Sequence, residues 1–129
     1  MTVVGLVLVA FAAAVHGYVF VLESLRWMRP STRAVFGLAT EDEAATTRLL
    51  AFNQGFYNLF LAVVAVIGVV LIASGASAAG YALAIAGAGS MIGAGLVLLA
   101  SSPNLRRAAL VQALPPALGL VALGIGALR

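Results

Sequence analysis

The sequence predicts an all-α polytopic membrane protein, a bundle of four transmembrane helices, and three observations lead to this prediction. Of the 129 residues, 64% are hydrophobic and only 9% are charged, whereas a soluble domain carries about a quarter charged residues. The charges gather between Glu23 and Arg48, at the start of the last apolar stretch and at Arg129. The remaining stretches are apolar over about the 20 residues that span a bilayer. We therefore treat residues 1–129 as a single transmembrane domain.

The first helix is expected over about residues 2–27. Its apolar start lacks the basic segment of a signal peptide and runs past signal-peptide length, so we expect it to remain as a span. The second helix is expected over residues 41–73, where Thr40 and Glu43 have the spacing of a capping box. The three acids at residues 41–43 suit the first turn of a helix. A metal cluster there is the weaker alternative, because adjacent carboxylates on a helix point in different directions.

The third helix is expected over residues 76–100 and the fourth over residues 106–128, with Pro103 ending the third. The third helix contains no charge and carries a GxxxG pair, Gly89 and Gly93. Small faces of this kind let membrane helices approach closely. Two interpretations are open: close packing within the bundle, or a seam between copies of the chain in a homo-oligomer.

The arginines predict an orientation. Six of the seven lie in the first and third loops: Arg26, Arg29, Arg33, Arg48, Arg106 and Arg107. By the positive-inside rule both loops face the cytoplasm and both termini lie outside. The net charge is +3, but the arginines flank apolar spans and form no groove or stripe. This pattern disfavours a nucleic-acid partner. Membrane lipid is the expected partner.

Polar side chains within the predicted spans fall at matching depths in the cytoplasmic half. Counted from the arginines at the boundary, at about 1.5 Å per residue, Glu23 lies about 5 Å deep. Asn53 and Gln112 lie about 8 Å deep, and His16 and Asn58 about 15 Å deep. Ionisable groups inside a membrane nearly always face the protein interior or a wet cavity. We therefore expect the carboxamides to face His16 and Glu23 across the bundle.

These groups predict a pocket for a lipid-soluble or amphipathic small molecule. Glu23 and His16 are the candidate catalytic acid and base, and a proton-transfer reaction such as an isomerisation suits them. They lie about 10 Å apart along one helix, so shared chemistry needs a ligand or water between them. Seven residues are expected to bind the ligand: Asn53, Gln54, Tyr57, Asn58, Gln112, Trp27 and Tyr18. Pro115 and Pro116 add a kink beside this layer.

Other functions stay open. The chain could be a small proton-coupled transporter or channel subunit, although the outer half offers no polar path. It could also be an accessory protein whose amides only join helices, as single amides in transmembrane helices often do. We expect no metal site, because one histidine and one reachable carboxylate make a poor ligand set and cysteine is absent. We expect no cofactor either, since nucleotide-binding glycine motifs are missing.

Four segments also carry a family resemblance: "HGYVFVLESLRW", "VFGL", "NQGFYN" and "VQALPPAL". Together they resemble the bacterial membrane-protein family catalogued as domain of unknown function 1304, over essentially the whole chain. Its most specific positions correspond to His16, Tyr18, Glu23, Trp27, Asn53, Gln54, Gly55, Tyr57, Asn58 and Gln112. Leu59 stands where the family often has glycine, and Arg26 where an apolar residue is more usual. The resemblance implies a four-helix bundle in the inner (plasma) membrane of a bacterial cell, and no known reaction.

Overall fold

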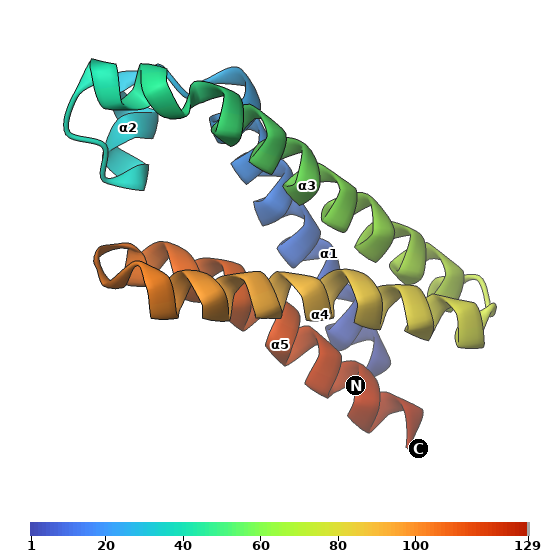
Figure 1. The fold of residues 1–129 in the computed structure, drawn as a ribbon. Helices are drawn as coiled ribbons and strands as arrows, with labels where there is room; N and C mark the ends of the chain where they lie inside the picture. Colours follow the sequence, from blue (N-terminus) through green and yellow to red (C-terminus); the bar gives the residue numbers. More distant parts are fainter. Residues whose placement is uncertain (129) are drawn as a thin grey trace.

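The computed structural model describes residues 1–128, and all four expected helices are present in it (Figure 1). They are α1 (Thr2–Phe20), continued by a π-helical turn η1 (Val21–Leu25), α3 (Glu41–Ala73), α4 (Ser77–Ser101) and α5 (Arg106–Ala127). Each of the four is long and apolar enough to cross a membrane. The all-α membrane bundle predicted from the sequence is therefore confirmed.

The beginning of α3 shows why this helix begins where the sequence predicts. The Thr40 hydroxyl oxygen accepts a hydrogen bond from the Glu43 backbone N–H at 3.1 Å. The Glu43 carboxylate in turn accepts one from the Ala39 backbone N–H at 3.0 Å. Two backbone donors that have no partner within the helix are satisfied in this way.

A short helix, α2 (Pro30–Phe36), lies between η1 and α3 and was not expected from the sequence. Pro30 occupies its first turn, where a missing N–H costs nothing. Gly37 ends it with a φ of 69°, and the Leu38 N–H donates to the Arg33 carbonyl at 2.9 Å. This is the hydrogen-bond pattern of a Schellman cap. The cap needs one residue in the left-handed backbone conformation, which glycine adopts without strain.

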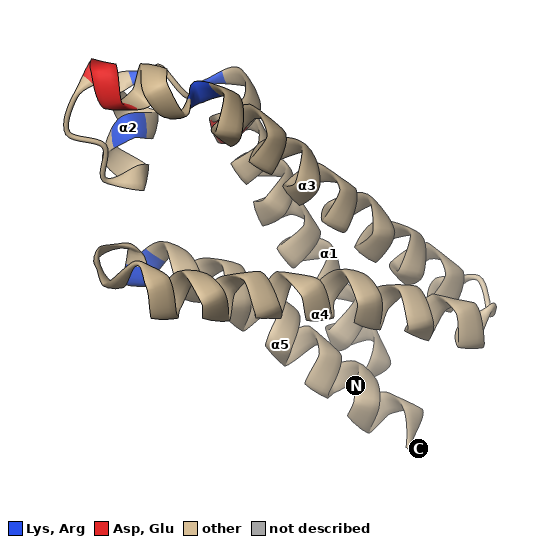
Figure 2. Cartoon of the chain, in the orientation of Figure 1, with Lys and Arg blue, Asp and Glu red and all other residues tan. Residues whose placement is uncertain are grey.

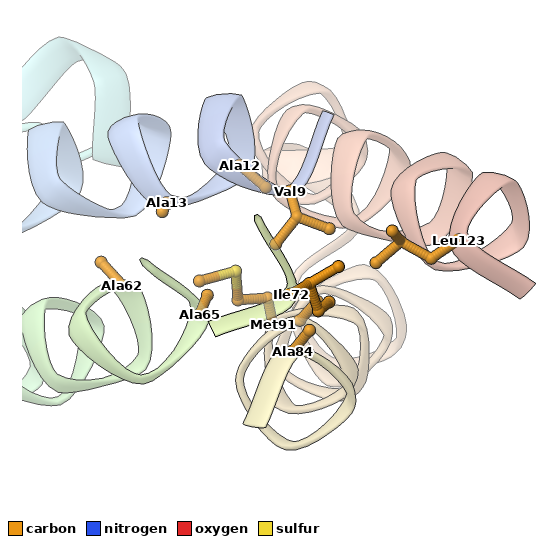
Figure 3. Close-up of a cluster of buried hydrophobic side chains, with 10 residues drawn as sticks. Val9, Ala12, Ala13, Ala62, Ala65, Ile72, Ala84, Met91 and Leu123 are labelled. Carbon is orange, nitrogen blue, oxygen red and sulfur yellow. The ribbon is translucent and has the colours of Figure 1, made fainter. Parts of the chain in front are cut away.

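The four long helices form a ring in which α1 and α4 are diagonal partners. Helix α1 packs against α3 and α5, and α4 packs against the same two neighbours. A cluster of buried side chains fills the centre (Figure 3). Six of its ten members are alanines, so the backbones approach closely; the members are Val9, Ala12, Ala13, Ala62, Ala65, Ile72, Ala84, Ala88, Met91 and Leu123. Such packing, with polar contacts, holds helices together where lipid removes the hydrophobic driving force.

The contact between α3 and α4 depends on glycines at its closest points. A Cβ atom added at Gly68 would lie 2.5 Å from the backbone nitrogen of Ala84, and one at Gly80 would lie 2.6 Å from that of Ile72. One at Gly87 would lie 2.8 Å from the backbone nitrogen of Ala65. Real Cβ atoms do not approach backbone this closely, so these three positions accept no larger residue without moving a helix.

The GxxxG pair of α4 lies on a different face. A Cβ atom added at Gly89 or Gly93 would meet no atom of the described residues within 4 Å. Of the two interpretations of this pair, close packing within the bundle is therefore wrong. The buried face of α4 contains Gly87, and a residue two positions further along a helix is rotated by about 200°. Gly89 and Gly93 thus face outward.

The charged residues gather at one end of the bundle (Figure 2). This end holds α2, the start of α3 and the connection between α4 and α5, a 3₁₀ turn η2 (Pro103–Leu105). Among residues 1–128, the opposite end, with the N-terminus and the turn between α3 and α4, carries no charged side chain. Arg129, the one basic residue expected there, lies outside the described residues.

Candidate functional site

Glu23 lies in the π-helical turn η1 and not in regular α-helix. Turns of this kind are rare and are frequent at functional sites. The Asn58 side-chain amide of α3 donates a hydrogen bond to Glu23 Oε2 at 2.8 Å, and a second one to the Gln54 backbone carbonyl at 3.1 Å. Asn58 therefore ties the carboxylate of the first span to the second span.

Gly55 allows η1 to lie directly against α3. The Ser24 hydroxyl donates a hydrogen bond to the Phe52 carbonyl at 2.8 Å, which joins the two segments. A Cβ atom at Gly55 would overlap Ser24 Oγ, and it would lie 3.0 Å from Ser24 N and 3.1 Å from the Glu23 Cβ. The missing side chain thus brings Glu23 within reach of Asn58. In a helix interior glycine is less favourable than alanine by about 1 kcal/mol. A glycine inside the predicted second helix is therefore the feature of the sequence that indicates a close contact at this position.

A cavity of about 260 Å³ lies beside Glu23, between η1, α2, α3, α4 and α5; we call it the polar cavity. Polar side chains from three of these elements line it: Glu23, Gln54, Tyr57, Asn58 and Gln112. Apolar side chains complete the wall: Phe36, Leu61, Ala94, Leu98, Leu105 and Ala108. The structure therefore brings five of the expected site residues to one cavity.

A second cavity of about 550 Å³ adjoins the first, between α1, η1, α2, η2 and α5; we call it the adjoining cavity. Its lining is mainly apolar, with Val19, Leu22 and Val111 among its members and Tyr18 beside them. The two cavities share four lining residues: Phe36, Leu105, Ala108 and Gln112. The polar cavity thus lies beside a larger, mainly apolar one.

The two prolines of α5 remove the helical hydrogen-bond donors of two residues that line the adjoining cavity. Helix α5 continues through Pro115 and Pro116 without a break in its assignment. Neither proline has an N–H to donate to the carbonyl four residues earlier. Those carbonyls belong to Val111 and Gln112, which both line the adjoining cavity. Two residues that line this cavity therefore have backbone carbonyls that receive no hydrogen bond from the residue four positions later.

Three expected site residues lie elsewhere, and His16 and Asn53 are two of them. His16 is fully buried, its Nδ1 lies 3.0 Å from the Ala12 carbonyl, and its Nε2 has no hydrogen-bond partner within residues 1–128. Asn53 is exposed. Neither residue lines the polar cavity or the adjoining cavity.

Helix geometry explains both separations. His16 and Glu23 share a face only on a regular α-helix, and the π turn rotates the residues within and beyond it relative to α1. Asn53 precedes Asn58 by five residues, which places it about 140° around the helix. The carboxamides therefore do not gather around His16 as expected from the sequence.

Trp27, another expected ligand-binding residue, joins the first loop to α3. Its indole N–H donates to the Ala44 carbonyl at 3.0 Å, and its ring contacts that of Phe36 with centroids 4.9 Å apart. With its donor used in this way, Trp27 supports the end of the bundle beside the cavities and lines neither of them.

Replacing Trp27 by phenylalanine is expected to keep the ring contact and to remove the hydrogen bond to Ala44. A bond of this kind contributes about 0.5–1.5 kcal/mol. Hydrogen exchange should therefore become faster for the amides of residues 44–48, while those of α4 serve as the internal control. Unchanged exchange at residues 44–48 would show that the indole N–H does not hold the start of α3.

Comparison with known proteins identifies one family. A family model described as protein of unknown function (DUF1304) matches residues 10–124. This range includes most of α1 and α5, all of α3 and α4, and every residue that lines the two cavities. No curated protein and no solved structure matches the chain.

Proposed function

The chain belongs to the DUF1304 family of proteins of unknown function. We propose that it is a small membrane protein that binds a lipid-soluble or amphipathic small molecule. The ligand's polar head occupies the polar cavity and its apolar part the adjoining cavity. One observation carries the proposal: side chains from η1, α3 and α5 with polar groups converge on a single cavity.

The polar groups suit a ligand head group that donates or accepts hydrogen bonds. Asn58 donates to one carboxylate oxygen of Glu23, and a carboxylate offers further acceptor sites on both oxygens. Gln54 and Gln112 each bring an amide with one acceptor and two donor hydrogens to the same lining. A hydroxyl or amine on the ligand would find acceptors here, and a carbonyl would find donors.

The sizes of the cavities suit a small amphiphile. Ligand pockets commonly measure about 300–1,000 Å³, with mostly apolar walls and a few placed polar groups. The polar cavity, at about 260 Å³, holds a head group, and the adjoining cavity, at about 550 Å³, holds a short chain or ring system. Gln112 lines both cavities and would contact the ligand where its two parts meet.

Binding is favoured over the acid–base chemistry expected from Glu23 and His16. The imidazole lies outside both cavities, so Glu23 is the carboxylate available to a ligand in the polar cavity. A transporter is disfavoured because the buried cluster around Met91 fills the centre of the bundle with apolar side chains. We place the arginine-rich end in the cytoplasm of a bacterial cell by the positive-inside rule, with both termini outside.

The proposal is tested by mass spectrometry of the molecules that co-purify with the protein in mild detergent. Wild type is compared with Asn58→Leu, with Glu23→Gln and with the matched control Asn53→Leu. The two asparagine variants make the same chemical change on the same helix, but only Asn58 lines the polar cavity. We expect one defined small molecule in wild type and in Asn53→Leu, reduced at least about tenfold in Asn58→Leu, which corresponds to about 1.4 kcal/mol.

Two results would contradict the proposal. If wild type carries only bulk phospholipid, the amides serve helix packing alone. If Asn53→Leu and Asn58→Leu lose the molecule equally, it binds outside the polar cavity. Thermal unfolding of each variant establishes that any loss of the molecule occurs in folded protein.

A further inference from the structure

A third cavity, which shares Glu23 with the polar cavity, brings three arginines together. It measures about 400 Å³ and lies between η1, the segment that follows it and the N-terminal part of α3. Arg26, Arg29 and Arg48 line it; we call it the arginine pocket. All three side chains are exposed, and among residues 1–128 none forms an ion pair with a carboxylate within 4.0 Å. The pocket therefore concentrates positive charge that the described residues do not neutralise.

Hydrogen bonds connect the two walls of this pocket. The Ser24 hydroxyl donates to the Phe52 carbonyl at 2.8 Å, and the indole N–H of Trp27 donates to the Ala44 carbonyl at 3.0 Å. Arg48 lies midway between Ala44 and Phe52 on α3, so the two bonds lie on either side of it along the helix. The arginines thus come from segments whose relative position is held by direct contacts.

The lining combines these charges with apolar side chains. Leu25, 65% exposed, and Phe52, 42% exposed, line the same pocket. Glu23 is the one carboxylate in the lining, and its Oε2 accepts the hydrogen bond from Asn58. Three guanidinium groups beside one carboxylate leave an excess of positive charge.

We propose that the arginine pocket binds the phosphate group of an anionic phospholipid, with the acyl chains along Leu25 and Phe52. Guanidinium groups bind phosphate through paired hydrogen bonds. Basic pockets at the ends of membrane-spanning helices hold anionic head groups. The apolar rim favours a lipid over a soluble phosphate ester. The zwitterionic choline head group is disfavoured because its cation would lie beside three arginines.

The test is a titration of the purified full chain in mild detergent, followed by native mass spectrometry. The added ligands are dioleoyl phosphatidylglycerol, dioleoyl phosphatidylcholine and glycerol 3-phosphate. The variant Arg26→Gln, Arg48→Gln is compared with the control Arg33→Gln, Arg106→Gln, which loses the same charge at the same end of the bundle. We expect wild type and the control to bind one phosphatidylglycerol in preference to phosphatidylcholine. The pocket variant should bind it about 30-fold more weakly, as expected for about 1 kcal/mol from each of two arginines.

Three results would overturn the proposal. Equal weakening in both double variants would mean general attraction by charge. Equal binding of the two lipids would remove the preference for an anion. Glycerol 3-phosphate bound as tightly as the lipid would identify a soluble phosphate as the ligand. If the pocket double variant does not fold, Arg29→Gln alone is titrated, with a loss of about fivefold expected.

Discussion

Replacing Gly68 by valine is expected to lower the midpoint of thermal unfolding in detergent by on the order of 10 °C. An added Cβ atom at this position would lie 2.5 Å from the backbone nitrogen of Ala84 and 2.9 Å from its Cα. Backbone atoms cannot rotate away as a long side chain can, so α3 and α4 must separate. Overpacking commonly costs about 1–3 kcal/mol and more where the backbone has to move. The free energy of unfolding should fall by about 3 kcal/mol.

The matched control is Gly93→Val on the outward face of α4. No atom of the described residues lies within 4 Å of a Cβ atom added there. Its thermal midpoint should therefore stay close to that of wild type. A change in oligomer mass at an unchanged midpoint would place the face with Gly89 and Gly93 at a subunit seam. Equal destabilisation by the two substitutions would contradict the close packing of α3 against α4.

Replacing Gly55 by alanine is expected to disrupt the proposed site as well as the fold. The new methyl group would overlap Ser24 Oγ, so η1 must move away from α3 and the hydrogen bond from Ser24 to the Phe52 carbonyl is lost. That bond contributes about 0.5–1.5 kcal/mol and the overpacking about 1–3 kcal/mol. The better helix propensity of alanine offsets about 1 kcal/mol. The free energy of unfolding should therefore decrease by about 0.5–3.5 kcal/mol in total.

In the wild-type chain the Asn58 amide lies 2.8 Å from the Glu23 carboxylate. Gly55→Ala is expected to move Glu23 away from Asn58 and to break this hydrogen bond. The co-purified small molecule should therefore decrease together with stability. Gly17→Ala is the control, because a Cβ atom at Gly17 in α1 would meet no described atom within 4 Å. That variant should be as stable as wild type or slightly more stable, with the molecule retained. A Gly55→Ala variant with wild-type stability and full retention would contradict the role given to this close contact.

The local features of the fold were predictable because they depend on short stretches of chain. Apolar runs of membrane-spanning length predicted four helices, and four are present. The start of α3 was predicted from Thr40 and Glu43 alone, since a cap depends on residues a few positions apart. The gathering of charge at one end of the bundle also followed from sequence, because it depends only on which loops contain the arginines.

The candidate site was only partly predictable. Depth counting placed Glu23 about 5 Å, Gln112 about 8 Å and Asn58 about 15 Å deep, whereas in the structure all three line the polar cavity. It could not detect the π turn at Val21–Leu25 that changes the face on which Glu23 lies. Both Asn53 and Asn58 were expected to bind the ligand, although only Asn58 lines the polar cavity.

The sequence by itself determined the class of protein, the number of long helices and the end of the bundle at which polar and charged groups meet. The tertiary structure decided which face of each helix is buried, which glycines make the close contacts, and that His16 is separate from Glu23. The reason is physical. These helices are apolar on nearly every side, so no contrast between polar and apolar faces marks the side that packs inward. Only the fit between small residues on facing helices, such as Gly68 against Ala84, selects that side.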